Sequence, residues 1–120
     1  MTNQAELLRV LRDRGFEHVF AEDLCYEEQV RLFAETRSLV ALHGAGLVNM
    51  LHSDPGRLGV IEILSEAYLN PHYYWLSRTL GVRYYDAVVG ARLNWQSNYS
   101  VDPVALAAAV DRLLASDASG

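Results

Sequence analysis

One stretch of the chain combines residue types that could bind a phosphate group: Leu42-His43-Gly44-Ala45-Gly46-Leu47-Val48-Asn49. It follows a continuous apolar run, residues 38–42, which is typical of a parallel strand covered on both faces. Ligands of open α/β sheets bind at the carboxyl ends of such strands. Glycines there let the backbone approach a phosphate closely, and the unpaired N–H groups of the next helix can donate to it. The spacing therefore predicts an anion-binding turn at the end of this strand.

Two side chains of this stretch could add specific contacts. His43 ends the strand and could donate a hydrogen bond to a diphosphate oxygen or to a sugar. Asn49 lies one turn into the next helix, where it could orient the loop or touch the ligand. The segment from Gly44 to Asn49 is a G-x-G-x-x-G fingerprint whose last glycine is replaced, and a partial fingerprint is weak evidence. A tight turn that needs small residues, with His43 as a structural histidine, explains the same pattern.

The residues on either side predict strands that alternate with helices. Gly15 and Gly81 end two of the helices, and Pro103 takes the first position of the last one. This alternation indicates βαβ units, and hence a Rossmann-like, three-layer α/β fold with a parallel sheet. Helices are expected at residues 3–14, 26–36, 47–52, 72–80 and 103–114, and strands at residues 18–21, 38–42, 59–64 and 82–88.

The order of these elements suggests that the sheet is incomplete. A doubly wound domain begins with a central strand, whereas this pattern opens with a helix. We therefore expect residues 1–120 to form a single, truncated domain that lacks its first strand and the loop after it. A truncated sheet exposes an unpaired edge and an apolar face, so the chain could form homo-oligomers.

The composition excludes several classes of function. The chain has 120 residues, a net charge of −5 and no run of basic residues, whereas nucleic-acid binding depends on clustered Lys and Arg. No stretch approaches the roughly 20 apolar residues of a membrane helix, and the first residues carry no secretory signal, so a soluble protein is expected. Every basic residue is Arg and Ala is abundant, which is typical of a GC-rich bacterial genome.

Few side chains could hold a metal or act as a nucleophile. The single Cys excludes an internal disulfide, and the histidines stand at no metal-ligand spacing, so no metal site is expected. Cys25 precedes a helix with Glu28 at its third position, which predicts a capping box. Thiols at helix N-termini can have lowered pKa values, which leaves a nucleophilic role for Cys25 open, although no histidine partner lies nearby in sequence.

Aromatic residues gather in two places. Tyr73, Tyr74 and Trp75 occupy consecutive helix positions, so they cannot all face one way, and we expect them mainly to pack in the core. Trp95 lies in the polar loop of residues 94–100, where aromatic side chains often stack on a base or sugar or cover a site. Trp95 could therefore lie near a ligand.

Several motifs, in the same order along the chain, resemble the glycosyltransferase 61 family. The segment His43-Gly44-Ala45-Gly46-Leu47, followed by Asn49, is similar to the hallmark of that family. The resemblance covers about residues 3–90, and several motifs in order are stronger evidence than any one alone. The other motifs are Asn3-Gln4-Ala5-Glu6-Leu7, Gly15-Phe16-Glu17-His18-Val19, Tyr26-Glu27-Glu28-Gln29-Val30-Arg31-Leu32-Phe33, Pro55-Gly56 and Val60-Ile61-Glu62-Ile63.

The resemblance implies an inverting glycosyltransferase that uses a nucleoside-diphosphate sugar as its donor and no other cofactor. Members of the family have a GT-B-like arrangement of two Rossmann-like domains, and this chain would be the C-terminal half, which holds the donor. On this interpretation His43 and the backbone of residues 44–47 cradle the diphosphate. Glu62, at the end of the next strand, would accept hydrogen bonds from ribose hydroxyls, the alternative being a solvated charge at a strand end.

Other parts of such an enzyme would lie outside this chain. These parts are the acceptor-binding domain, the catalytic base and the arginines that the family carries upstream. The catalytic residues are therefore unknown, and the chain alone should bind a donor weakly or not at all and should not turn over. The acceptor would be a glycan or a glycolipid, and the pathway capsular or cell-surface polysaccharide synthesis in the bacterial cytoplasm or at its membrane.

Two other classes of function remain open. A glycine turn, a helix and a strand-end acid occur in that order in NAD-dependent oxidoreductases, although the third glycine is replaced and the motif comes late in this chain. The other alternative is a non-catalytic α/β module that packs against a partner or dimerises.

Overall fold

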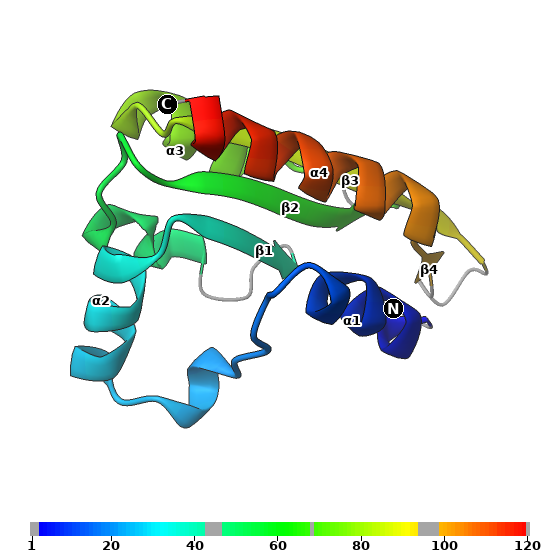
Figure 1. Cartoon of the computed structure of the whole chain (residues 1–120), viewed down its shortest axis with the longest axis horizontal. Coiled ribbons are helices and arrows are strands. Elements are labelled where there is room, and N and C mark those ends of the chain that lie inside the picture. The colour runs from blue at the N-terminus through cyan, green and yellow to red at the C-terminus, as the bar shows by residue number, and fades with distance from the viewer. Residues whose placement is uncertain (1–2, 43–46, 68, 94–98, 120) are drawn as a thin grey trace.

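In the described part of the chain, four strands form one sheet at the centre of the molecule (Figure 1). The computed structural model describes the backbone of residues 3–42, 47–67, 69–93 and 99–119. The strands β1 (Ser38–Leu42), β2 (Gly59–Ser65) and β3 (Tyr84–Arg92) are parallel neighbours in that order, and β4 (Tyr99–Ser100) is antiparallel to the end of β3. The expected α/β fold is confirmed, but its sheet is not parallel throughout. The connection from β3 to β4 is too short for the crossover that parallel strands need.

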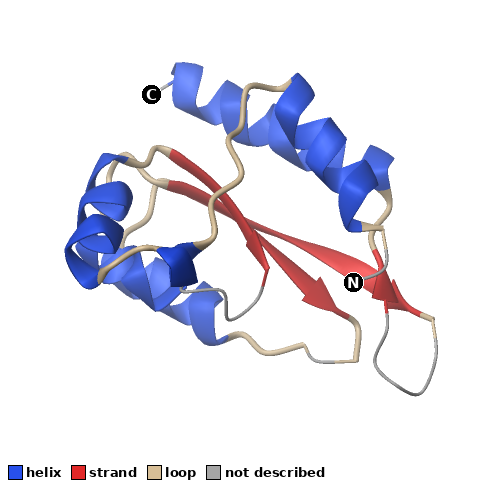
Figure 2. Ribbon diagram, turned by 90° about the horizontal axis from the view of Figure 1, so that it is seen from below, coloured by secondary structure: helices blue, strands red, loops and turns tan. Residues whose placement is uncertain are grey.

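Helices flank the sheet, and Figure 2 shows them on two sides of the strands. Helices α1 and α4 contact each other on one side, whereas η2 contacts α2 and α3 on the other. The α-helices are α1 (Gln4–Asp13), α2 (Tyr26–Glu35), α3 (His72–Leu80) and α4 (Pro103–Ser119), and the 3-10 helices are η1 (Ala21–Asp23) and η2 (Leu47–His52).

Two hydrophobic cores, one on each face of the sheet, hold these elements together. The side chains of β2 alternate between the two cores, since successive residues of a strand point to opposite faces. Ile61 and Ile63 pack in the first core with Leu7 of α1 and with α4. Val60 packs in the second core with three residues of η2 and the segment after it, Leu47, Met50 and Leu58. Every residue of β2 is buried, and each fully buried Leu or Ile contributes about 1.5–3 kcal/mol, so β2 is the centre of the fold.

The glycines that were expected to end helices do so. Gly15 has φ of +85°, and the N–H groups of Gly15 and Phe16 donate to the carbonyls of Arg12 and Leu11, each at 3.0 Å. Gly81 closes α3 in the same left-handed conformation, with φ of +77°. Only glycine adopts this conformation without a steric penalty, which is why the sequence shows where both helices end.

Asn3 occupies the N-cap position of α1. The side chain of Asn3 makes no capping hydrogen bond. Its Nδ2 donates to the carbonyl of Val101 at 2.7 Å, and its Oδ1 accepts the Val101 N–H at 3.1 Å. An ion pair between Arg14 and Asp111, with 2.9 Å between Nε and Oδ1, joins the other end of α1 to α4. Asn3 therefore fastens α1 to the segment before α4.

The expected strand at residues 18–21 is wrong. Residues 18–20 belong to no strand, and η1 begins at Ala21. The side chains of Val19 and Phe20 are 43% and 52% exposed. A strand requires a neighbour whose N–H and C=O groups it can pair with, and among the described residues no strand lies between this segment and β1.

The expected packing of the aromatic cluster on α3 is correct for one residue only. Tyr73 packs against the second core. Tyr74 and Trp75 are 39% and 61% exposed, which contradicts the core positions expected for them. Successive helix residues point in different directions, and the second core takes only one of these three rings.

Candidate functional site

The predicted phosphate-binding turn connects the carboxyl end of β1 to η2. In the sheet, Ala41 pairs with Glu62 and Leu42 pairs with Ile63. The strand β2 continues to Ser65, so β1 ends beside the middle of β2. Four of the predicted site residues lie outside the described part of the chain, and their roles stay predictions: His43, Gly44, Ala45 and Gly46. The loop residue Trp95 also lies outside it.

Buried apolar side chains anchor the helix that follows the turn. Leu47, the first residue of η2, is 0% exposed, and Met50 is 1% exposed. Both pack with Leu58 and Val60 in the second core. The side chain of Leu47 therefore faces the protein interior, which leaves its backbone as the part that a ligand could contact.

Asn49 links η2 to α2. Its Nδ2 donates to Oε1 of Gln29 at 2.9 Å, and Nε2 of Gln29 donates to the carbonyl of Leu24 at 3.1 Å. These two bonds connect η2 with α2 and with the loop before it. The two roles that the sequence offered for Asn49, orienting the loop and touching the ligand, stay predictions.

Glu62 lies in the middle of β2, not at the end of the strand where the sequence placed it. The strand is longer than expected because β3 pairs with it as far as Ser65. Glu62 is 0% exposed, and the hydroxyl of Tyr85 donates to its Oε1 at 2.5 Å. Its partners in register are two small residues, Ala41 and Ala87, which leave room for the carboxyl group. Glu62 is thus a buried acid with a specific donor.

The hydroxyl of Tyr85 is held in its protonated form. Burial raises the pKa of Tyr85 well above its ordinary value, and the hydrogen bond to Glu62 and the charge of that carboxylate raise it further. The ring of Tyr85 also meets the ring of Tyr74 edge-on, with 5.4 Å between their centroids. At neutral pH Tyr85 is therefore a fixed donor to the buried acid.

The sequence did not predict the partners of Asn49 and Glu62, which are Gln29 and Tyr85. Gln29 stands in the second-helix motif and follows the capping pair of Cys25 and Glu28, in which the Cys25 N–H donates to Glu28 Oε1 at 3.2 Å. Its position one turn into a helix gave no sign of a partner on η2. Tyr85 lies 23 residues from Glu62, and only the register of β2 and β3 brings the two together.

The family model of glycosyltransferase 61 matches residues 1–61, just over half of the 120-residue chain. The chain belongs to the glycosyltransferase 61 family. The match includes α1, α2, β1, the glycine turn, η2 and the first residues of β2. A search of curated proteins and a search of solved structures found no significant match.

Membership of the glycosyltransferase 61 family implies a sugar donor and an acceptor. The matched segment contains the whole turn from β1 to η2 and ends at Ile61, one residue before Glu62. In this glycosyltransferase 61 chain, the described residues contain no cluster of three His, Cys, Asp or Glu side chains that could hold a metal ion. No helix among them has the length and apolar character needed to cross a membrane.

Proposed function

We propose that this glycosyltransferase 61 chain binds the diphosphate of a nucleoside-diphosphate sugar at the turn after β1. The observation that carries the proposal is the position of that turn at the carboxyl end of a parallel strand, where α/β sheets bind ligands. The helix after the turn is anchored in the second core, and the family match spans the whole segment. A nucleotide donor fits the sugar-transfer chemistry of the family.

Main-chain amides and one imidazole supply the recognition. The helix η2 is a 3-10 helix of six residues, so few peptide dipoles are aligned behind the turn and the helix dipole contributes little. The amides of residues 44–47 therefore donate to the phosphate oxygens directly. The ring of His43 adds a hydrogen bond to a charged oxygen.

Glu62 acts on the turn and not on the ribose. Its carboxyl group is fully buried and accepts the Tyr85 hydroxyl, so direct contact with a ribose would require the packing around it to open. It lies level with Ala41, one residue before the end of β1. A buried acid at this level can orient hydrogen-bond donors of the neighbouring turn. This role replaces the expected direct contact with the nucleotide.

The chain is the donor-binding, C-terminal half of a GT-B-like enzyme that inverts the anomeric carbon of the transferred sugar. Its 120 residues have the size of one domain. In this proposal a second Rossmann-like domain binds a glycan or glycolipid acceptor and supplies the catalytic base. The 120 residues alone then bind the donor weakly and without turnover. We assign the enzyme to capsular or cell-surface polysaccharide synthesis in the bacterial cytoplasm or at its membrane.

A binding experiment on the 120-residue chain tests the proposal. His43→Ala should weaken the binding of UDP, GDP or CDP, whichever binds best, by about 10- to 100-fold, since a hydrogen bond to a charged group contributes about 1.5–3 kcal/mol. Saturation-transfer NMR with the three nucleotides and with NAD measures this, because the method detects weak complexes. His18→Ala is the control, since His18 is exposed in the segment before η1. Equal affinity of His43→Ala and the unmodified chain, or a preference for NAD, would contradict the proposal.

A further inference from the structure

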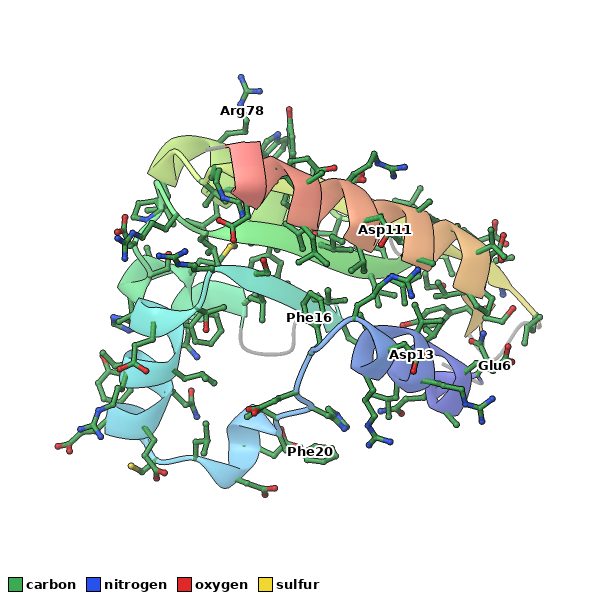
Figure 3. All side chains as sticks on the ribbon, in the orientation of Figure 1. Glu6, Asp13, Phe16, Phe20, Arg78 and Asp111 are labelled. Atoms are coloured by element: carbon green, nitrogen blue, oxygen red, sulfur yellow. The ribbon has the colours of Figure 1, made fainter. Side chains whose placement is uncertain are left out.

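Helix α2 is connected to the rest of the molecule mainly through η2, which it contacts more extensively than any other helix or strand. Figure 3 shows Phe16 close to β1 and Phe20 far from it, near η1, so the segment before α2 diverges from the sheet. A cavity of about 670 Å³ lies beside the sheet and is lined by residues of both α2 and β1. Side chains at the boundary of α2 and η2 are therefore the ones through which α2 can act on the turn before η2.

A backbone carbonyl fixes the orientation of the Gln29 side chain on α2. A main-chain oxygen can only accept hydrogen bonds, so the end of the amide that faces it must be the nitrogen. The carbonyl of Leu24 accepts from Nε2 of Gln29 at 3.1 Å. The reversed amide would place two acceptor oxygens against each other. Oε1 of Gln29 is therefore the atom that points towards η2.

The orientation of Gln29 in turn fixes that of Asn49, the third residue of η2. Oε1 of Gln29 accepts a hydrogen bond at 2.9 Å, and only the nitrogen end of the Asn49 amide can donate it. Oδ1 of Asn49 is therefore directed away from Gln29. Among the described residues, no group donates a hydrogen bond to this oxygen. Asn49 is half-buried and thus presents an acceptor on the side away from α2.

We propose that Gln29 is a positioning residue for donor binding: it holds Asn49 so that Oδ1 accepts a hydrogen bond from a hydroxyl group of the nucleoside-diphosphate sugar. The inference rests on the proposed function, because it needs the diphosphate at the turn just before η2. Phosphate oxygens act as acceptors, so Oδ1 does not bind the diphosphate itself. Hydroxyl groups of the ribose and of the transferred sugar flank the diphosphate, and both can donate. Gln29 and Asn49 both lie within the segment that the family model matches.

A second contact between the same two helices provides a control. The hydroxyl of Tyr26 lies 3.4 Å from Nε2 of His52, and their rings meet edge-on with 5.7 Å between centroids. His52 is the last residue of η2, so this contact joins α2 to the end of η2 that is farther from the turn. Tyr26→Phe removes the hydroxyl and keeps the ring. It should therefore leave the orientation of Asn49 unchanged.

NMR of the Asn49 side chain tests the hydrogen bond in the free 120-residue chain. In Gln29→Leu, the side-chain NH2 protons of Asn49 should exchange with water at least about 10-fold faster than in the unmodified chain, since a hydrogen bond protects an amide from exchange. Gln29→Glu keeps an acceptor oxygen for Asn49 and should retain the slow exchange, as should Tyr26→Phe. Circular dichroism checks that the variants fold. Slow exchange in Gln29→Leu, or fast exchange in a folded Gln29→Glu, would overturn the inference.

Ligand titrations by NMR test the contact with a hydroxyl group. The ligands are inorganic pyrophosphate, UDP and UDP-glucose, with GDP and GDP-mannose as a second series. Gln29→Leu should weaken the binding of the sugar nucleotide by about 3- to 10-fold, the effect of one neutral hydrogen bond, and should not change the binding of pyrophosphate, which carries no sugar hydroxyl. A loss that extends to UDP or GDP assigns the hydroxyl to the ribose, and a loss confined to the sugar nucleotide assigns it to the transferred sugar.

A double variant shows whether Gln29 acts through Asn49. In the Asn49→Ala background, Gln29→Leu should cause no further loss of affinity, because the side chain that it positions is already absent. Additive losses, or an equal loss with pyrophosphate, would overturn the inference, since Gln29 would then act on the turn or the fold. Absence of nucleotide binding by the unmodified chain would overturn the proposed function and the hydroxyl contact with it. The exchange of the Asn49 side chain would still decide whether Gln29 orients Asn49.

Discussion

At the scale of single residues, the pair of Glu62 and Tyr85 places a fully buried carboxyl group beside a specific hydrogen-bond donor. A carboxyl group without exposed surface loses its hydration, and its partners must compensate for that loss. Tyr85 supplies one such partner across the boundary between β2 and β3. The two neighbours of Glu62 in register, Ala41 and Ala87, are small. The pair of Glu62 and Tyr85 therefore joins β2 to β3 in the middle of the sheet.

Tyr85→Phe should lower the free energy of unfolding by about 1–3 kcal/mol, because it leaves a buried acceptor without this donor. Tyr74→Phe is the matched control: Tyr74 is more exposed and touches Tyr85 through its ring, which the substitution keeps. The control should change stability by less than about 0.5 kcal/mol. Urea unfolding followed by circular dichroism measures both. Equal losses in the two variants would mean that the hydrogen bond to Glu62 is unimportant.

The pH dependence of the same variant separates the hydrogen bond from a general packing effect. The folded protein holds the proton of Tyr85 more tightly than the unfolded chain, since burial and Glu62 raise its pKa. Its contribution to stability is thus complete below about pH 10, the ordinary tyrosine value, and is lost as the pH rises above that value. The unmodified chain should lose stability between about pH 9 and pH 11 more steeply than Tyr85→Phe. Parallel curves for the two proteins would argue against a raised pKa.

At the scale of elements, the features that could be predicted from the sequence were those caused by residues within the element itself. The ends of α1 and α3 were predictable because Gly15 and Gly81 act through their own backbone conformation. The strand expected at residues 18–21 was not, because a strand depends on a neighbour that the segment itself does not encode. The strand β2 ends one residue later than expected, because Ser65 pairs with Gly90. Glu62 was assigned to the end of this strand, although the expected range of residues 59–64 already placed it inside.

Gly81→Ala should destabilise the protein by about 1–2 kcal/mol, since φ of +77° is unfavourable for any residue with a Cβ atom. An added Cβ would meet nothing within 4 Å, so the cost comes from the backbone alone. Gly56→Ala is the control, because it has only one ordinary contact, at 3.7 Å, and no positive φ. Thermal unfolding should show a lower Tm for Gly81→Ala than for Gly56→Ala. The opposite order would mean that the end of α3 does not depend on this conformation.

At the scale of the whole molecule, the two sides of the sheet differ in completeness. On the side of β3, the strand β4 pairs with β3 and helix α4 packs against both β2 and β3. The side chain of Asn3 also donates a hydrogen bond to the carbonyl of Val101, which connects the start of α1 to this side. On the side of β1, an open edge faces a cavity. The chain also carries a net charge of −5, which repels anions, so the binding that we propose relies on local hydrogen-bond donors at the turn. The fold class could be predicted from the alternation of elements, whereas this asymmetry follows from pairing over long distances.

The central claim, that the turn after β1 binds a diphosphate, is tested most directly by backbone NMR of the 120-residue chain. UDP, GDP and CDP are titrated separately to millimolar concentration while the amide signals are followed. The account predicts that the nucleotide that binds shifts the amides of residues 43–47 first and most, with smaller shifts at Asn49 and Gln29, which adjoin the turn through η2. Shifts centred on another surface, or no shift at residues 43–47 with any of the three nucleotides, would contradict it.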